Sequence, residues 1–481
     1  MNWKKALATF SGPLLFIVLS LFPLPLGSVL MSKVIGMILW MLIWWITEVI
    51  PMGATSLLPI AVFPLTGILS IDKTCLSYGN KYVFLFMSGF VIALAMERWQ
   101  LHRRLALSIV KKTGVGANRI ILGFYTASFL ISMWISNTAT ALMMFPIATS
   151  VIALLLHKDH QLHGKKEKNF ALALMLSIAY GSSIGGIATL VGSPPNAAMA
   201  GILSAEPFNQ TVAFFDWFKL GLPFAIALYF ISYLLLVYVI FPNKLGKFEM
   251  GTKLIDQELA SLGKWSVEEK RVFIVFVSTA LLWIFQQQIS EFIPKDIAQI
   301  SDVGIGITAA LSFFLIPSKN EKGQALLSWK DTERLPWGVL LMFGGGLALS
   351  EAFKESGLIN LVTESMTNMD KSNLFFFVTV LCFVGLILTA LMSNLAMVNI
   401  FVPIVAALAV GAGIDPMLFA IPVTISASCD FMFPMSTPPN AIAYSSGHIK
   451  AADMFRAGIL LNILSLILLA SYECILIYFV V

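Results

Sequence analysis

The sequence predicts an all-α polytopic membrane protein, and three observations support this fold class. Of the 481 residues, 58% are hydrophobic and only 12% are charged, and the mean hydropathy of +0.86 lies outside the range of water-soluble domains. Apolar runs recur along the whole chain, many of them long enough for a membrane span. Basic residues gather between these runs. We expect about 11 transmembrane helices plus two re-entrant helical hairpins in an inverted repeat.

The first apolar stretch, Leu14 to Leu30, follows Lys4 and Lys5 as the apolar part of a signal peptide would. Because many further apolar runs follow it, we expect an uncleaved first transmembrane helix. The apolar runs, in chain order, are 12–31, 34–50, 53–70, 83–97, 120–156, 170–206, 217–241, 272–289, 303–317, 337–352, 374–411, 418–447 and 454–480.

The net charge of +5 is explained by where the Lys and Arg residues lie. Lys and Arg are enriched in the cytoplasmic loops of membrane proteins, and a cytoplasmic N-terminus places most basic clusters of this chain on that side. The pattern predicts a multi-pass protein of the cell membrane, in contact with lipid, and gives no reason to expect a nucleic-acid partner. The basic clusters are Arg98 to Arg119, Lys158 to Lys168, Lys244 to Arg271 and Lys319 to Arg334.

The run from Ile120 to Leu156 has basic clusters on both sides, so both of its ends should be cytoplasmic. Its polar centre, Ser136-Asn137-Thr138, leaves arms that are too short for two complete spans of ~20 residues. A re-entrant hairpin with a polar tip fits better. Because lipid cannot satisfy the hydrogen bonds of irregular backbone, the tip must lie inside the protein or line a cavity.

A second copy of this arrangement spans Asn373 to Ala412, with Ser393-Asn394-Leu395 at its centre. Each hairpin is followed by a helix that a Pro-Pro-Asn sequence interrupts, at Pro194–Asn196 and Pro438–Asn440. A Pro-Pro pair removes two backbone donors and breaks a helix. Simple kinks are the alternative, but two matching sets of loops disfavour them. Paired broken helices in two inverted halves predict a transporter site near the bilayer midplane.

The chemistry of the four loops favours a small anion. No Lys or Arg lies within or beside them in the sequence, so the positive potential must come from helix N-termini, from Ser, Thr and Asn donors, or from bound cations. Two Ser-Asn tips facing each other suggest two anionic groups, as in a dicarboxylate. Carbonyl and Asn side-chain oxygens at the same loops suit a hard monovalent cation.

The four loops resemble those of the divalent-anion/sodium symporter family, the dicarboxylate, tricarboxylate and sulfate carriers, and the resemblance covers nearly the whole chain. Further segments similar to family signatures are Trp44–Pro51, Ala95–Arg104, Gly344–Leu349 and Pro434–Ile442. The resemblance implies a homodimer in which a transport domain moves against a scaffold like an elevator. It implies substrate contacts at Ser136, Asn137, Thr138, Ser393, Asn394, Thr437 and Pro438. It implies sodium sites at Ser132, Ser136, Asn137 and Gly192 in the first half, and at Thr389, Met392, Asn394 and Ser436 in the second.

The resemblance also divides the chain into four parts. Residues 1–118 are expected to form scaffold helices of the first half, and 119–215 its transport domain. Residues 216–335 would be scaffold helices of the second half with a cytoplasmic linker, and 336–481 its transport domain with the C-terminal helix.

Two positions depart from the family pattern. Leu395 replaces a hydroxyl residue at the second tip, and Asp430 places a carboxylate six residues before Ser436. Asp430 is either a structural residue with a backbone or Lys partner, a fixed charge that alters or replaces the second cation, or a protonatable coupling group. These departures favour secondary transport of small di- or tricarboxylates, of the succinate, malate and 2-oxoglutarate class, by sodium-independent exchange. Sodium-coupled symport is the alternative.

Other classes of protein fit less well. A membrane-embedded enzyme would need paired carboxylates, a metal motif or a Ser with a base inside the spans, and the sequence offers none of these. A channel rarely needs two inverted sets of broken helices. His157, His160 and His163 could suggest a metal site, but their Lys-rich segment favours a solvated linker. We expect neither a cofactor nor a bound structural metal.

Overall fold

The computed structural model describes residues 3–25, 28–155, 164–247, 249–292, 299–321, 323–365 and 374–480. Within these ranges the regular secondary structure is helical, apart from two isolated β-bridges. Seven of the described helices are long and apolar enough to cross a membrane, and further apolar helices are shorter. The predicted fold class, an all-helical polytopic membrane protein, is confirmed.

The N-terminal helices differ from the sequence prediction. Helix α1 (Trp3–Leu21) begins and ends earlier than the expected first span from Leu14 to Leu30, and helix α2 (Val29–Thr47) covers the next apolar run, 34–50. Two prolines, Pro23 and Pro25, follow the end of α1 and remove backbone donors there. The hydroxyl of Ser28 accepts a hydrogen bond from the Met31 N–H at 3.1 Å and caps α2. The prediction of the first span was therefore wrong in its bounds.

The first half contains one hairpin and one interrupted helix. Five helices precede them: α3 (Met52–Thr55), α4 (Leu58–Thr66), α5 (Ile71–Tyr78), α6 (Lys81–Arg98) and α7 (Leu101–Thr113). The hairpin is α8 (Ala117–Ser132) and α9 (Asn137–Ala153), and the interrupted helix is α10 (Lys165–Ile187) with α11 (Pro194–Ser204). Both breaks occur where the sequence predicts them.

The second half repeats this order. Its preceding helices are α12 (Phe214–Leu234) with a π-helical extension η1 (Leu235–Ile240), α13 (Glu249–Ser261), α14 (Val267–Ile284), α15 (Gln286–Phe292), α16 (Asp302–Leu315), the 3₁₀ helix η2 (Trp329–Arg334), α17 (Trp337–Glu355) and α18 (Leu358–Ser365). The hairpin is α19 (Leu374–Leu391) and α20 (Asn394–Gly411), the interrupted helix is α21 (Met417–Ala427) with α22 (Pro438–Ser445), and α23 (Ala451–Val480) follows.

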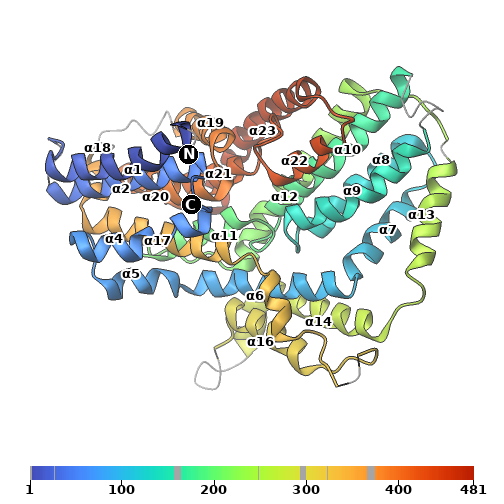
Figure 1. Ribbon diagram of the computed structural model, residues 1–481, viewed down its shortest axis with the longest axis horizontal. Coiled ribbons are helices and arrows are strands. Elements are labelled where there is room, and N and C mark those ends of the chain that lie inside the picture. Colours follow the sequence, from blue (N-terminus) through green and yellow to red (C-terminus); the bar gives the residue numbers. More distant parts are fainter. Residues whose placement is uncertain are drawn as a thin grey trace.

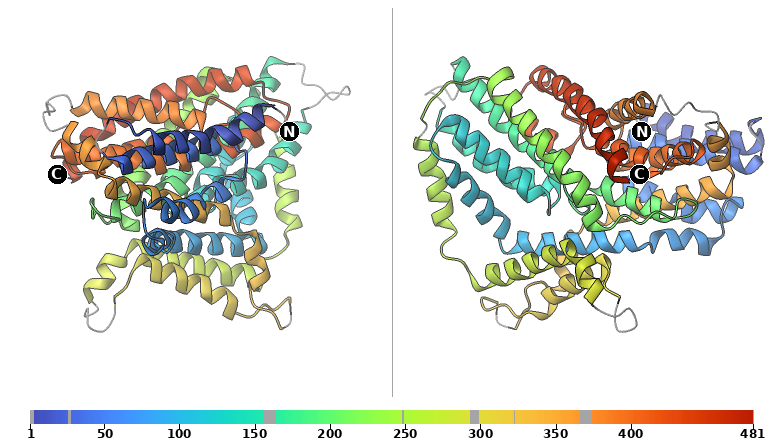
Figure 2. Two further views of the ribbon diagram at one scale, coloured as in Figure 1. Left: turned by 60° about the vertical axis from the view of Figure 1, so that its left-hand side comes forward. Right: turned by 180° about the vertical axis from the view of Figure 1, so that it is seen from behind.

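The two hairpins approach the centre of the molecule from opposite sides. Figure 1 shows α8 and α9 on the right, next to α10, and α19 and α20 on the left, with α11, α21 and α22 between the two hairpins. Figure 2 shows the same two groups from behind as lobes that diverge from the centre. The hairpin helices have 16 to 18 residues, which is about 24–27 Å of helix and less than the ~30 Å of a bilayer core. Helices α19 and α20 are among the seven candidate spans by length and composition. The tip residues Ser136 and Ser393 nevertheless line the same cavity, so the two tips meet inside the protein.

Three of the four basic clusters are joined by ion pairs. Arg103 on α7 contacts Glu258 on α13 at 2.5 Å, and Arg104 contacts Glu269 at the start of α14 at 2.7 Å. Arg98 at the end of α6 contacts Glu321 at 2.6 Å and also pairs with Asp331 on η2. These contacts bring the three basic segments together on one face of the molecule. Such a face is expected because Lys and Arg are enriched in cytoplasmic loops. We call it the basic face.

Candidate functional site

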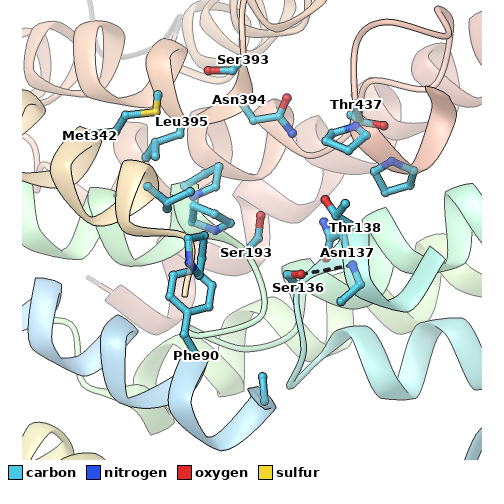
Figure 3. Close-up of a pocket in the computed structure, with 18 of the residues that line it drawn as sticks. Phe90, Ser136, Asn137, Thr138, Ser193, Met342, Ser393, Asn394, Leu395 and Thr437 are labelled. Carbon is cyan, nitrogen blue, oxygen red and sulfur yellow. Dashed lines mark hydrogen bonds between the residues drawn. The ribbon is translucent and has the colours of Figure 1, made fainter. Parts of the chain in front are cut away.

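A cavity of about 500 Å³ lies where the four polar loops meet. Figure 3 shows Ser136, Asn137 and Thr138 on one side of this space and Ser393, Asn394 and Thr437 on the other. All seven residues expected to contact substrate line the cavity. The polar lining residues are Ser136, Asn137, Thr138, Ser193, Ser393, Asn394, Ser436 and Thr437, and the adjoining prolines are Pro194, Pro195, Pro438 and Pro439.

Each hairpin tip is a helix N-terminus that opens into the cavity. The hydroxyl of Ser136 accepts a hydrogen bond from the Ala139 N–H at 3.2 Å at the start of α9. The hydroxyl of Ser393 accepts one from the Ala396 N–H at 3.3 Å at the start of α20. Serine is a preferred N-cap because its oxygen satisfies a free N–H of the first turn. The remaining N–H groups and the helix dipole provide positive potential for an anion.

Two further N-termini reach the same cavity from the interrupted helices. Both α11 and α22 begin with a Pro-Pro pair, and proline is favoured at the first helical position because its N–H would be free there. The hydroxyl of Thr437 accepts a hydrogen bond from the Asn440 N–H at 3.4 Å. Four helix N-termini therefore meet at one cavity, an arrangement suited to an anion with two charged groups.

The asparagine side chains of the two Pro-Pro-Asn motifs form equivalent hydrogen bonds to backbone carbonyls that precede them in the chain. The amide of Asn196 donates to the carbonyls of Gly186 at 2.9 Å and Thr189 at 2.8 Å. The amide of Asn440 donates to the carbonyls of Asp430 at 3.3 Å and Phe433 at 3.1 Å. The acceptors lie ten and seven residues before the asparagine in both halves. The two halves thus correspond residue by residue.

Comparison with known proteins identifies the family. Residues 3–479 match the family described as the sodium:sulfate symporter transmembrane region. The chain belongs to the sodium:sulfate symporter family. This confirms the resemblance to divalent-anion/sodium symporters, and the protein is a member of a transporter family and not an enzyme.

Two relatives are similar to this chain over nearly its whole length. It is 37% identical over 479 residues to the sodium-dependent dicarboxylate transporter SdcS of Staphylococcus saprophyticus, covering 97% of this chain and 90% of that protein. It is 38% identical over 474 residues to the SdcS protein of Staphylococcus aureus, covering 95% and 88%. The crystal structure of the Alcanivorax borkumensis YdaH transporter shares the fold, with a TM-score of 0.56 and 14% identity over 83% of this chain and 85% of that one.

The first-half residues expected to bind a cation place several oxygen atoms around Asn137. The hydroxyl of Ser132 lies 2.6 Å from the Asn137 side-chain oxygen. With the amide turned over, its nitrogen donates to the carbonyls of Ser182 at 3.1 Å and Gly192 at 3.3 Å. A β-carbon at position 192 would lie 2.8 Å from the Gly186 carbonyl, so glycine is required there. This oxygen-rich environment fits a hard monovalent cation.

The second half of the chain repeats the contact between a hydroxyl and the tip asparagine at its own hairpin. The hydroxyl of Thr389 donates to the Asn394 side-chain oxygen at 2.9 Å and lies 3.0 Å from the Ala427 carbonyl. Ser132 and Thr389 are both buried, five residues before the tip asparagine. Met392 is also buried, and Ser436 lines the cavity. The expected second-half ligands therefore lie close to one hairpin tip and the facing loop.

The structure adds two charged residues to the cavity that the sequence analysis did not place there. Arg334, at the end of η2, and Glu97, near the end of α6, both line it. No Lys or Arg lies within or beside the four loops in the sequence, and Glu97 is far from them along the chain. The tertiary fold, through the short connection from η2 to α17, brings Arg334 to the cavity. The Leu335-Pro336 pair directly after Arg334 is the one feature of the sequence that could have indicated the position of Arg334.

The wall of the cavity is apolar on one side. Leu395 lies beside Met342 in Figure 3, and Phe90 of α6 lies below them. Thr138 occupies the position in the first hairpin that corresponds to Leu395. The cavity is therefore polar at the first tip and partly apolar at the second, which suits an organic anion with a hydrocarbon chain.

Asp430 does not line the cavity among the described residues. It follows α21 and is completely buried. Within the described part of the chain Asp430 forms no ion pair with a Lys. The Met432 backbone N–H and the Ser436 hydroxyl lie beside its carboxylate, but neither is in hydrogen-bonding geometry.

Two remaining predictions concern other segments. His157, His160 and His163 lie outside the described residues, and within the described residues no group of three metal-ligating side chains is present. The triple glycine of α17, Gly344 to Gly346, lies in the segment similar to a family signature and makes close helix contacts. A β-carbon at Gly345 would approach the Ser56 carbonyl to 2.7 Å, and one at Gly344 would collide with the ring of Tyr78.

Proposed function

We propose that this protein is a secondary active transporter of small dicarboxylates that is coupled to sodium. The observation that supports this most directly is the meeting of four helix N-termini at one cavity of about 500 Å³. The names of the similar Staphylococcus proteins support both the substrate class and the coupling ion.

In this proposal the hairpin tips hold the two carboxylates. Ser136, Asn137 and Thr138 contact one carboxylate, and Ser393 and Asn394 contact the other. Thr437 and Pro438, at the start of α22, add the helix N-terminus facing the second tip. Leu395 contacts the hydrocarbon chain. Anions bind to such N-termini because free N–H groups and the helix dipole stabilise negative charge without a buried cationic side chain.

Sodium is a co-transported ion in this proposal. It binds at Ser132, Ser136, Asn137 and Gly192 in the first half, and at Thr389, Asn394 and Ser436 in the second. Because these residues share the tip asparagines with the dicarboxylate, each cation orders the loop that holds the anion. Binding of the two is then mutually favourable, since linkage between sites is reciprocal.

Transport would follow an elevator movement in a homodimer. Parts 119–215 and 336–481 contribute the hairpins and interrupted helices that form the mobile domain, and parts 1–118 and 216–335 contribute the scaffold. The cavity reaches Arg334 and Glu97 beside the basic face, so with a cytoplasmic N-terminus the site opens to the cytoplasm in this conformation.

Sodium-independent exchange is the second candidate, because Leu395 and Asp430 alter the second half. Uptake of labelled succinate into proteoliposomes separates the two functions. Sodium-coupled symport requires an inward sodium gradient and needs no internal substrate. Uptake that ignores sodium but requires internal unlabelled dicarboxylate would establish exchange, and absence of di- or tricarboxylate uptake under either condition would refute both.

A further inference from the structure

Asp430 is a buried carboxylate with no visible counter-charge. Its exposed fraction is 0%. Within the described residues it takes part in no ion pair, and neither of its oxygens has a partner in hydrogen-bonding geometry, although the Met432 N–H and the Ser436 hydroxyl lie beside them. A desolvated, unpaired carboxylate is strongly unfavourable. In a membrane segment such a group indicates a functional partner.

The internal repeat shows where the side chain of Asp430 is directed. The amide of Asn440 donates to the backbone carbonyl of Asp430, as the amide of Asn196 donates to that of Gly186. Positions 430 and 186 therefore correspond in the two halves. A β-carbon at Gly186 would lie 2.5 Å from the side-chain oxygen of Asn137. By this correspondence, the side chain of Asp430 leaves the backbone towards Asn394 at the second hairpin tip.

Other oxygen atoms near Asp430 also have no partner. The hydroxyl of Ser428 and the side-chain oxygen of Asn440 form no hydrogen bond, and the Ser436 hydroxyl is a neighbour of the carboxylate. The amide nitrogen of Asn440 is already used by backbone carbonyls. The group is therefore rich in acceptors and poor in donors, and a cation satisfies such a set better than another hydrogen-bonding side chain does.

We infer that Asp430 is a direct ligand of a sodium ion in the second half of the chain, together with oxygens of the Asn394 tip and the 428–436 loop. This inference rests on the proposed sodium-coupled function and assigns a charged ligand that the first half lacks. At the first-half position the corresponding residue is Gly186, and the expected ligands are neutral.

The two sodium ions then differ in their dependence on substrate. The first-half ion keeps its full charge and is stabilised by the incoming dicarboxylate. The second-half ion is neutralised by Asp430, so it binds without substrate. Binding of the dicarboxylate should increase the affinity for the first ion more than the affinity for the second.

Binding of radioactive sodium to the purified full-length protein in detergent, without dicarboxylate, tests this inference. Ionic strength is held constant with choline chloride, and a potassium chloride series is included. We expect the wild type to bind sodium and Asp430→Asn, which keeps the shape but removes the charge, to bind it about tenfold more weakly or not at all. Asp430→Gly introduces the residue found at the corresponding first-half position, Gly186, and should show the same loss of sodium binding.

Asp415→Asn is the matched control. Asp415 precedes the same interrupted helix, and its carboxylate accepts a hydrogen bond from the Met417 N–H at 2.8 Å, a role that asparagine also fills. This variant should bind sodium as the wild type does. Thermal unfolding in choline chloride checks that each variant is folded.

Equal sodium binding by wild type and both Asp430 variants would overturn the inference, and so would a wild type that binds no sodium. Succinate uptake by the wild type tests the proposed function separately. Uptake driven by sodium together with unchanged binding in Asp430→Asn would refute the role of Asp430 alone. Sodium binding that is lost in Asp430→Asn without any carboxylate uptake would support the cation site and refute the transport proposal.

Discussion

In the proposed function, substrate binding and cation binding both depend on the tip asparagines. Asn137 is surrounded by the Ser132 hydroxyl and by two backbone carbonyls, and Asn394 accepts from Thr389. Each asparagine is the first residue of a helix whose N-terminus faces the cavity. A single side chain thus links the cation environment to the anion environment.

Replacement of either asparagine should abolish transport. We expect Asn137→Ala and Asn394→Ala to remove sodium-driven succinate uptake in proteoliposomes while the protein stays folded, because each loses a cation ligand and a substrate contact. Size-exclusion profiles and melting temperatures verify folding. Wild-type uptake in either variant would show that the binding site has been placed wrongly.

Arg334 should act on substrate capture. It is exposed and lines the cavity, so its charge attracts dicarboxylate anions without being buried. We expect Arg334→Gln to raise the KM for succinate offered from the side to which the cavity opens by about three- to tenfold, with a smaller effect at high salt.

Lys330→Gln provides the matched control for Arg334. Lys330 belongs to the same short helix η2 and is exposed, but does not line the cavity. Its replacement should leave the KM unchanged. Equal effects of the two substitutions would mean that overall surface charge, and not the position of Arg334, controls capture.

At the scale of elements, α17 depends on glycine for its contacts on three sides. Its glycines face Tyr78, Ser56 and Asn399 in turn. The amide of Asn399, in turn, donates to the Met342 carbonyl at 2.9 Å and ties α20 to α17. Small residues allow this close approach of helices within a membrane.

Gly346→Ala should therefore destabilise the protein. The added methyl group collides with the buried side chain of Asn399, and overpacking of this kind costs about 1–3 kcal/mol. Gly338→Ala in the same helix is the control, because its β-carbon would have no neighbour closer than 3.8 Å. Thermal unfolding in detergent should show a lower melting temperature for Gly346→Ala alone. Equal melting temperatures for the two variants would refute this packing role.

At the scale of the whole molecule, charged side chains form ion pairs at two opposite ends. The basic face contains η2 and the end of α6, joined by the ion pairs of Arg98. Helix α17 begins next to η2 and extends 19 residues to Glu355, about 28 Å away. There Lys354 pairs with Glu206 at the other end of the molecule.

Chemical labelling should report this orientation. In a variant without native cysteines, we expect a membrane-impermeant maleimide to label Lys330→Cys only in inside-out vesicles, and Glu206→Cys only in intact cells. Both side chains are exposed, so the membrane alone restricts access. The opposite pattern would place the N-terminus outside the cytoplasm.

Much of the element order was predictable because local signals determine it. The breaks at Pro194 and Pro438 follow from missing backbone donors, and the tips at Ser136 and Ser393 follow from N-capping by serine. The end of the first helix was mispredicted because the apolar run continues through Pro23 and Pro25. Hydrophobicity alone does not show where a helix ends.

The sequence by itself determined that this is a helical membrane protein with two duplicated sets of polar loops, because apolar length, proline and serine act through neighbouring residues. Only the tertiary structure decided that four helix N-termini share one cavity, that Arg334 and Glu97 reach it, and that Asp430 is fully buried without an ion-pair partner among the described residues. These properties depend on contacts between residues far apart in the chain. Burial and electrostatic partners are set by those contacts, so local sequence patterns do not reveal them.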